Sequence, residues 1–429
     1  MIRRLVVLAL LIGGAVLLEP LRAPTEGVIA PRSLFLFGIL LLTADTFGAL
    51  AHDLGLPRLV GYLLAGLALG PSVTGIVPAG VLEDLGMMER LAVGLIGLLA
   101  GAELRVADLR QRHRAILWIL ALQGAAVLLA VWGAALLGRQ WIPFLHGLAP
   151  TPLLFVSLLF AATLTVNSPM VTLAILTETK ARGPLARTTL GVVLVADVAV
   201  ILIFTAAFSL AQASLGGSAG ASAVLVHLLR EVLGAILGGI LVGAVLSLYL
   251  RFVKRELVVF AVVVVFATAA AAQALGFELL LSLLVAGFFV ENVAPVRAEP
   301  LVATLHRMAV PVFVIFFAMA GAELHLEAFA ALWPLVLAIA LVRMAAVMVG
   351  SRAGARVGGA EPAVVGQVWT GLVSQAGVAL GLATIVADRL PVLGAGMQVL
   401  IVGVIAFNES VGPVLFRHGL DRAGEIVTR

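Results

Sequence analysis

Apolar stretches long enough to cross a membrane follow one another along almost the whole chain, with short polar connections between them. A membrane-spanning helix needs about 20 mostly apolar residues, and a window of about 19 residues marks roughly fourteen such segments. They cover residues 5–18, 34–51, 59–77, 87–104, 115–137, 153–176, 189–215, 226–250, 257–275, 279–293, 308–324, 332–349, 364–387 and 399–416. The chain lacks the ten-residue alternation that is typical of a transmembrane β-barrel. The pattern therefore predicts an all-α polytopic membrane protein.

Composition supports this prediction and excludes several kinds of chemistry. Of the residues, 62% are hydrophobic and 12% are charged, whereas an ordinary soluble domain has about 25% charged residues. The absence of cysteine excludes disulfides, thiolate metal sites and cysteine nucleophiles. The seven histidines are scattered without the spacing of metal ligands, and no HExxH motif is present. We therefore expect no transition metal, no cofactor and no enzymatic activity.

The charges in the connections predict the orientation in the membrane. Lys and Arg collect in short cytoplasmic loops, and every second connection of this chain is basic, beginning with RVADLRQRHR at 105–114. The others lie around Lys180, Arg251, Arg297 and Arg352. These loops and the C-terminal tail are therefore expected in the cytoplasm, in a multi-pass protein of the inner membrane. The net charge of +4 is then a signal of topology, and we expect no nucleic-acid partner.

The first segment differs from the others. Arg3 and Arg4 precede the apolar run LVVLALLIGGAVLL, as in a signal peptide, but no clean small-x-small cleavage site follows. Residues 1–30 are thus a signal peptide or, as we favour, a retained signal-anchor helix. The expected transmembrane domain covers 31–418 with about 13 helices, and 419–429 form a cytoplasmic tail too short for a nucleotide-sensing module.

Ionisable groups at membrane depth are costly there and usually functional. Asp197 lies within LGVVLVADVAVILIF, and a carboxyl group in such surroundings can be protonated or bind a cation, but not readily both. This competition is the chemistry of antiport; the alternative is an Asp that pairs with a buried Arg or caps a broken helix. Arg343 lies near the middle of LAIALVRMAAVMVG and needs acceptors, either a carboxylate or the carbonyl ends of a broken helix. Its alternative is snorkelling to the cytoplasmic face.

Two polar interruptions of apolar segments predict broken helices. The first contains Thr163, Thr165, Asn167 and Ser168 before Pro169, and a proline removes a helical hydrogen bond and clashes with the preceding turn. Broken helices at corresponding positions of two halves indicate the binding site of a transporter.

The second interruption is TGLVSQAG at 370–377, with Ser374 and Gln375. By the loop charges, the two interruptions enter the membrane from opposite sides. This is the order expected of an inverted repeat.

Three further carboxylates rank lower as site residues. Asp45 lies within the second segment and Glu103 at the cytoplasmic end of the fourth, where capping or interfacial pairing is the simpler explanation. Glu409 lies in the last segment beside Asn408, where a structural hydrogen bond is the simpler explanation.

Several short motifs follow one another in an order and spacing that are specific when taken together. They are LPRLVGYLLAGLALGPS (56–72), LLAGAELR (98–105), NSPMVTLAILTE (167–178), GVVLVADV (191–198), VFVIFFAMAGAEL (312–324) and NESVGPVLF (408–416). They resemble the signatures of the sodium/proton exchanger domain, in the second branch of the monovalent cation:proton antiporter superfamily. The resemblance covers nearly everything after Ser33.

This resemblance implies a thirteen-helix fold with a dimerisation domain and a mobile core, which carries two crossed, unwound helices. It implies that Asp197 binds the ion, that 165–168 and 374–375 are the unwound segments, and that Arg343 neutralises helix ends or pairs with the carboxylate. It also implies an elevator-like movement and a homodimer in the lipid bilayer. The chain departs from the family at Ala196, where relatives carry a polar residue, and after Gly377, where relatives often carry Arg and Glu.

The sequence as a whole predicts a secondary active transporter that exchanges sodium or potassium for protons. A single carboxylate at position 197 suggests electroneutral, one-for-one exchange; the alternative is that Arg343 releases or blocks a charge, which leaves the stoichiometry open. A sodium-coupled organic-anion symporter with a related fold is the strongest alternative. A membrane sensor without transport activity is the other alternative, because of the departures at Ala196 and Val378.

Overall fold

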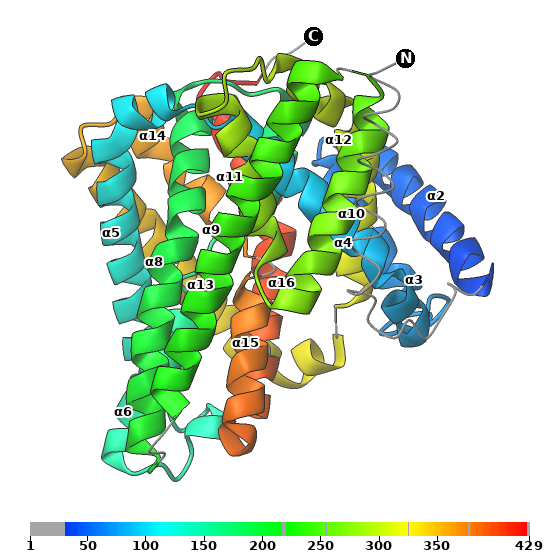
Figure 1. Ribbon diagram of the computed structural model, residues 1–429. Coiled ribbons are helices and arrows are strands. Elements are labelled where there is room, and N and C mark those ends of the chain that lie inside the picture. Colours follow the sequence, from blue (N-terminus) through cyan, green and yellow to red (C-terminus); the bar gives the residue numbers. More distant parts are fainter. Residues whose placement is uncertain (1–30, 217–219, 254, 325, 376–377, 427–429) are drawn as a thin grey trace. The chain divides into compact units, whose positions relative to one another are not determined.

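The computed structural model describes residues 31–216, 220–253, 255–324, 326–375 and 378–426, and all elements within them are helical. The side chains of a few further residues within helices, Asp197 and Val198 among them, lie outside the description. The predicted signal peptide or anchor, 1–30, also lies outside it. The all-α prediction is confirmed for the part of the chain that the structure describes (Figure 1).

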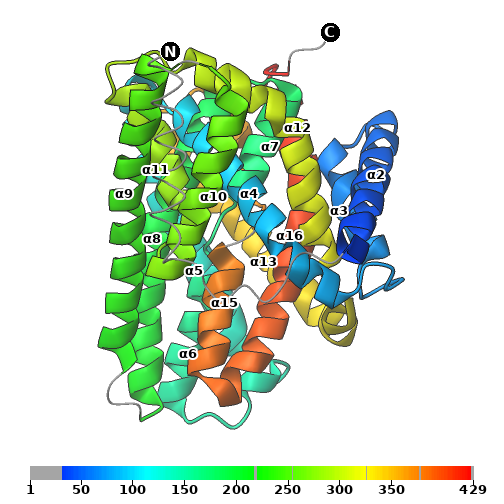
Figure 2. The same ribbon diagram turned by 45° about the vertical axis from the view of Figure 1, so that its right-hand side comes forward.

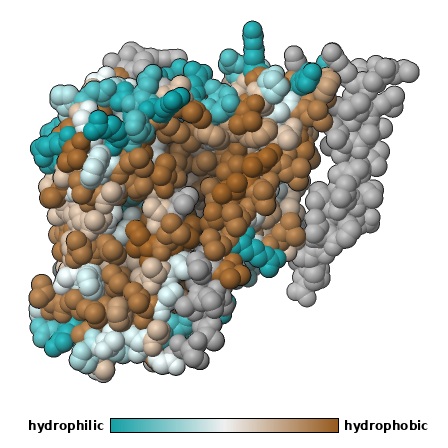
Figure 3. All heavy atoms as spheres, turned by 60° about the vertical axis from the view of Figure 1, so that its left-hand side comes forward, coloured by the Kyte–Doolittle hydropathy of each residue, from teal (hydrophilic) through white to brown (hydrophobic). Residues whose placement is uncertain are grey.

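Many of these helices are long and apolar enough to cross a bilayer. Among the described residues nine helices meet that criterion by length and composition, and four shorter apolar helices accompany them. Large hydrophobic side chains are exposed on them, such as Leu137 at 85% and Leu42 at 72%. On the face in Figure 3, hydrophobic residues cover much of the surface, and hydrophilic ones gather toward the upper and lower edges. The protein is a multi-pass membrane protein.

The chain divides into two compact units, and the first comprises residues 1–46, 62–107 and 227–323. Its described helices are α2 (Pro31–Asp53) and α3 (Arg58–Leu69), both shared with the second unit, α4 (Ala79–Glu103), α9 (Gly220–Phe252), α10 (Leu257–Leu275), α11 (Leu279–Asn292) and α12 (Glu299–Ala322). The helix α4 packs against α10, α11 and α12. It approaches α11 closely because Gly101 and Gly287 lack side chains; a Cβ on Gly101 would lie 1.8 Å from the Leu284 carbonyl oxygen.

The second unit comprises residues 47–61, 108–226 and 324–429. Its elements are α5 (Val106–Leu137), η2 (Pro143–Leu145), α6 (Pro150–Thr163), α7 (Pro169–Thr179), α8 (Pro184–Ser214), α13 (Leu326–Val357), α14 (Pro362–Gln367), η3 (Val368–Leu372), α15 (Val378–Arg389) and α16 (Pro391–Arg422). The same order of elements occurs twice in this unit. A 32-residue helix, α5 or α13, is followed by an interrupted segment and then by a helix of 31 or 32 residues, α8 or α16. Figure 2 shows the last pair, α15 beside α16.

Prolines set where the helices of this unit begin. Five helices have a proline in their first turn: Pro150, Pro169, Pro184, Pro362 and Pro391. At this position the backbone N–H would have no helical acceptor, so its absence costs nothing, and the fixed φ of proline suits the helix. Pro169 therefore starts α7 after the interruption, and the break lies in the residues before it.

A row of glycines brings α13 against α5. A Cβ on Gly350, Gly354 or Gly358 would lie 2.4 to 2.6 Å from backbone atoms of α5, so these positions accept no larger residue without separating the helices. Small residues at this spacing allow close packing of membrane helices.

Gly354→Ala is expected to destabilise the protein by about 1–3 kcal/mol through overpacking. The melting temperature of the detergent-solubilised protein should therefore fall. Gly124→Ala on α5 is the matched control, because nothing lies within 4 Å of a Cβ there. Equal melting temperatures for the two variants would contradict the assigned α5–α13 contact.

Candidate functional site

The first interruption separates α6 from α7. Helix α6 ends at Thr163 and α7 begins at Pro169, and every residue between them is buried. The hydroxyls of Thr163 and Thr165 donate to carbonyls of α6, both at 2.7 Å. Ser168 caps α7, because its Oγ accepts a hydrogen bond from the Val171 N–H at 3.2 Å. The polar run predicted from the sequence thus ends one helix and starts the next.

The second interruption follows η3 and lies beside the first. Ser374 and Gln375 are buried between η3 and α15, and residues 376–377 lie outside the described chain. The backbone N–H of Ser168 donates to the Ser374 carbonyl at 2.9 Å. This hydrogen bond joins two segments that are about 200 residues apart in sequence, and both belong to the second unit.

Arg343 connects the same two interruptions. Its side chain is fully buried, and it donates from Nε to the Leu164 carbonyl at 2.8 Å and from one terminal nitrogen to the Val166 carbonyl at 2.8 Å. The other terminal nitrogen donates to the Val373 carbonyl at 2.6 Å. Carbonyls at the end of a helix lack intrahelical partners and carry partial negative charge. The acceptors are therefore helix-end carbonyls, and the buried position excludes snorkelling.

Three carboxamides surround this arrangement besides Asn167. Gln375 donates from Nε2 to the Leu164 carbonyl at 3.3 Å, and Asn408 donates from Nδ2 to Gln375 Oε1 at 2.8 Å. Gln123 on α5 lies 3.5 Å from Asn167, as acceptor to its Nδ2. We did not select Gln123 and Asn408 from the sequence. The signal was present, since each is a polar residue inside an apolar segment, but both are neutral.

The helix that carries Asp197 packs against this region. Helix α8 contacts α6, α7 and η3, and Asp197 lies near the middle of it, although its side chain lies outside the description. Val193 and Val200, about one turn before and after, are buried.

The lower-ranked carboxylates have different surroundings. Asp45 is exposed on α2, and Glu103 forms a salt bridge with His306 at 2.7 Å, both within the first unit. Glu409 is buried on α16, beside Asn408.

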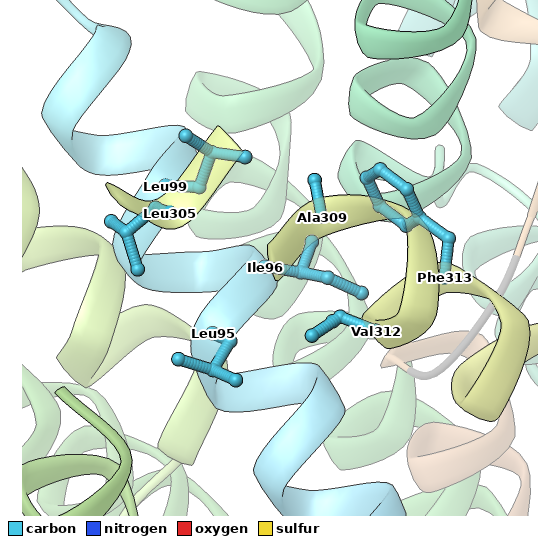
Figure 4. Close-up of a pocket in the computed structure, with 7 residues that line it drawn as sticks. All are labelled: Leu95, Ile96, Leu99, Leu305, Ala309, Val312 and Phe313. Atoms are coloured by element: carbon cyan, nitrogen blue, oxygen red, sulfur yellow. The ribbon is translucent and has the colours of Figure 1, made fainter. Parts of the chain in front are cut away.

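The apolar cavity between α4 and α12 does not compete with the interruptions as a site for a cation. Figure 4 shows an apolar cavity of about 10 Å³ in the first unit, between α4 and α12. Its lining is Leu95, Ile96, Leu99, Leu305, Ala309, Val312 and Phe313. The side chains that line this cavity carry no oxygen that could bind a cation. Among the described residues no group of three His, Asp or Glu side chains could hold a metal ion.

The comparisons with known proteins agree with the geometry. The sequence profile of the family described as sodium/hydrogen exchanger, transmembrane, matches residues 38–417. The chain belongs to this family. It is a family of transporters, and the resemblance to the sodium/proton exchanger domain expected from the sequence motifs is confirmed. A search of curated proteins found no match.

Solved structures of one archaeal antiporter share the fold of this exchanger-family chain. A structure of the sodium proton antiporter MjNhaP1 from Methanocaldococcus jannaschii at pH 8 has a TM-score of 0.60 and 15% identity, over 91% of this chain and 96% of that one. An electron-microscopy structure of the same antiporter has a TM-score of 0.65 and 16% identity, over 92% and 99%. At this identity the likeness establishes the fold alone.

Proposed function

We propose that this member of the exchanger family is a secondary active transporter that exchanges a monovalent cation, sodium or potassium, for protons. The observation that carries the proposal is the joining of two helix interruptions by Arg343, whose guanidinium donates to carbonyls of both. Interrupted helices expose backbone oxygens at membrane depth, and such oxygens suit an alkali cation. Family membership supports the same reading.

In this proposal Asp197 is the carboxylate that carries either the cation or the proton. Thr163, Thr165, Asn167 and Ser168 at the first interruption, and Ser374 and Gln375 at the second, line the ion pathway. Because desolvation favours the protonated carboxyl and a bound cation favours the carboxylate, loading a cation expels the proton. A neutral or compensated site crosses the membrane, whereas an unpaired charge faces a large barrier.

The proposal also includes the number of membrane crossings, the moving part, the oligomeric state and the orientation of the protein. The chain crosses the membrane thirteen times. Two crossed discontinuous helices, related by an inverted repeat, hold the site within the membrane. The second unit is the core that moves in an elevator-type cycle, and the first unit is the dimerisation part of a homodimer. The basic loops and the C-terminus face the cytoplasm, in the inner membrane.

Exchange is expected to be electroneutral. Arg343 keeps its charge in both directions of the cycle because its partners are backbone carbonyls of the same unit, so the charge moved per cycle depends on the single carboxylate. The initial rate of exchange in proteoliposomes should be the same at several clamped membrane potentials. A rate that changes severalfold with potential would require more than one proton for each cation.

Uptake of radiolabelled sodium or rubidium into acid-loaded proteoliposomes tests the proposed function. Uptake should need the outward proton gradient, should stop when a protonophore collapses that gradient, and should need no organic anion. A sodium-coupled symporter would instead take up sodium only together with an organic anion.

A further inference from the structure

Only one of the two polar atoms of the Asn408 side chain has a hydrogen-bond partner among the described residues. The side chain is fully buried on α16, and its Oδ1 has no hydrogen-bond donor among the described residues. A buried carbonyl oxygen without a partner is costly, and a leucine or methionine would avoid that cost at an ordinary packing position. The described partner of the Asn408 carboxamide is instead at its other atom, Nδ2.

Hydrogen bonds connect Asn408 Nδ2 to both interruptions. Asn408 Nδ2 donates to Gln375 Oε1 at 2.8 Å, which fixes the orientation of the Gln375 carboxamide. The Gln375 Nε2 then faces the Leu164 carbonyl and donates to it at 3.3 Å. The Leu164 oxygen also accepts the Nε hydrogen bond of Arg343. A side chain of α16 is thus linked, through one carboxamide, to the carbonyl that ends α6.

The backbone of α16 is positioned for this contact. A Cβ on Gly412, one helical turn after Asn408, would lie 2.1 Å from the Ser374 Oγ and 2.9 Å from the Ser374 nitrogen. Helix α16 therefore lies directly against the second interruption, and no larger residue than glycine fits at 412. The corresponding carboxamide contact at the first interruption, between Gln123 and Asn167, is longer at 3.5 Å.

We infer that Asn408 is a positioning residue that, through the hydrogen bond of Gln375 to the Leu164 carbonyl, keeps the two interruptions in the geometry in which the site binds the transported cation, and so sets the cation affinity. This inference rests on the proposed exchange of a cation for protons. Without the Asn408 donor, the Gln375 carboxamide is free to rotate and the Leu164 carbonyl loses one of its two described donors. The KM for the cation should then rise while the maximal rate changes little.

The test compares Asn408→Leu and Asn408→Asp in proteoliposomes. Ser410→Ala is a control on the same helix, since Ser410 is exposed and donates to the Ala406 carbonyl of α16 itself. Asn408→Leu should raise the KM about tenfold at every pH, as expected for the loss of a buried hydrogen bond. In Asn408→Asp the carboxyl group replaces the donor only when protonated. The ratio of its KM to the KM of wild type should be near one at acid pH and should rise at alkaline pH.

Among the described residues, Arg343 contacts the same interruptions and Glu409 is adjacent to Asn408. Both remain in every variant, as does Asp197 on α8, the proposed ion-binding carboxylate. If Asn408→Leu does not fold, the pH dependence of the KM of Asn408→Asp still tests the inference. A KM in both variants equal to that of wild type, or a pH-independent KM ratio in Asn408→Asp, would overturn the inference while leaving cation exchange intact. Absence of exchange in wild type would instead overturn the proposed function.

Discussion

Asp197→Asn is expected to abolish cation-dependent proton movement while leaving the protein folded. Asparagine keeps the size of the side chain but neither binds nor releases a proton, so the competition between proton and cation cannot occur. The position is on α8, the helix that packs against the elements of both interruptions. The measurement is the initial rate of exchange per folded protein, and it should fall to the level of empty liposomes.

Asp45→Asn is the matched control, since Asp45 is also within an apolar helix but is exposed. Its rate should equal that of wild type. If Asp197→Asn retained exchange, the carboxylate assignment would be wrong, and Glu409 would be the next residue to replace because it is the buried carboxylate beside Asn408.

Arg343→Ala is expected to lose both stability and transport. Three buried carbonyl acceptors, those of Leu164, Val166 and Val373, would each lose a donor. The Leu164 carbonyl keeps its hydrogen bond from Gln375, whereas leaving the Val166 and Val373 carbonyls without a described donor costs about 1–3 kcal/mol each, a large share of the stability of a typical protein. The variant should give little monodisperse protein in detergent and should show no exchange.

Arg343→Lys separates charge from geometry at this position. Lysine keeps the positive charge but cannot reproduce the planar fork that reaches three carbonyls. Its melting temperature should lie between those of wild type and Arg343→Ala. Arg389→Ala, at the exposed end of α15, is the control and should behave as wild type. Full stability of Arg343→Ala would mean that the helix-end carbonyls have other donors.

Much of the fold could be predicted because the solvent imposes it. In hydrocarbon the backbone must satisfy its own hydrogen bonds, so the apolar stretches indicated helices, and Pro169 indicated a helix break, which the structure has in the residues before it. The small-residue spacing of Gly350, Gly354 and Gly358 was weak evidence by itself in a chain with 45 glycines. In the structure these glycines pack against the backbone of α5.

The site was predictable only in part. The charged Arg343 was identified from its position, but two kinds of acceptor fitted the sequence equally well, because a guanidinium binds carboxylates and carbonyls alike. Gln123 and Asn408 were missed because a neutral amide costs less at membrane depth than a charge, and so stands out less. Their relation to the interruptions depends on contacts such as the one from α16 to Gln375, which no local pattern encodes.

Proton movement in proteoliposomes tests the central claim most directly. Purified protein would be reconstituted with a trapped pH-sensitive dye, and sodium, potassium or lithium would be added across a pH series, for wild type and Asp197→Asn. We predict a cation-dependent change of luminal pH in wild type that is absent in Asp197→Asn. No response of folded wild-type protein to any of the three cations, or an equal response in the variant, would contradict the proposed antiport at Asp197.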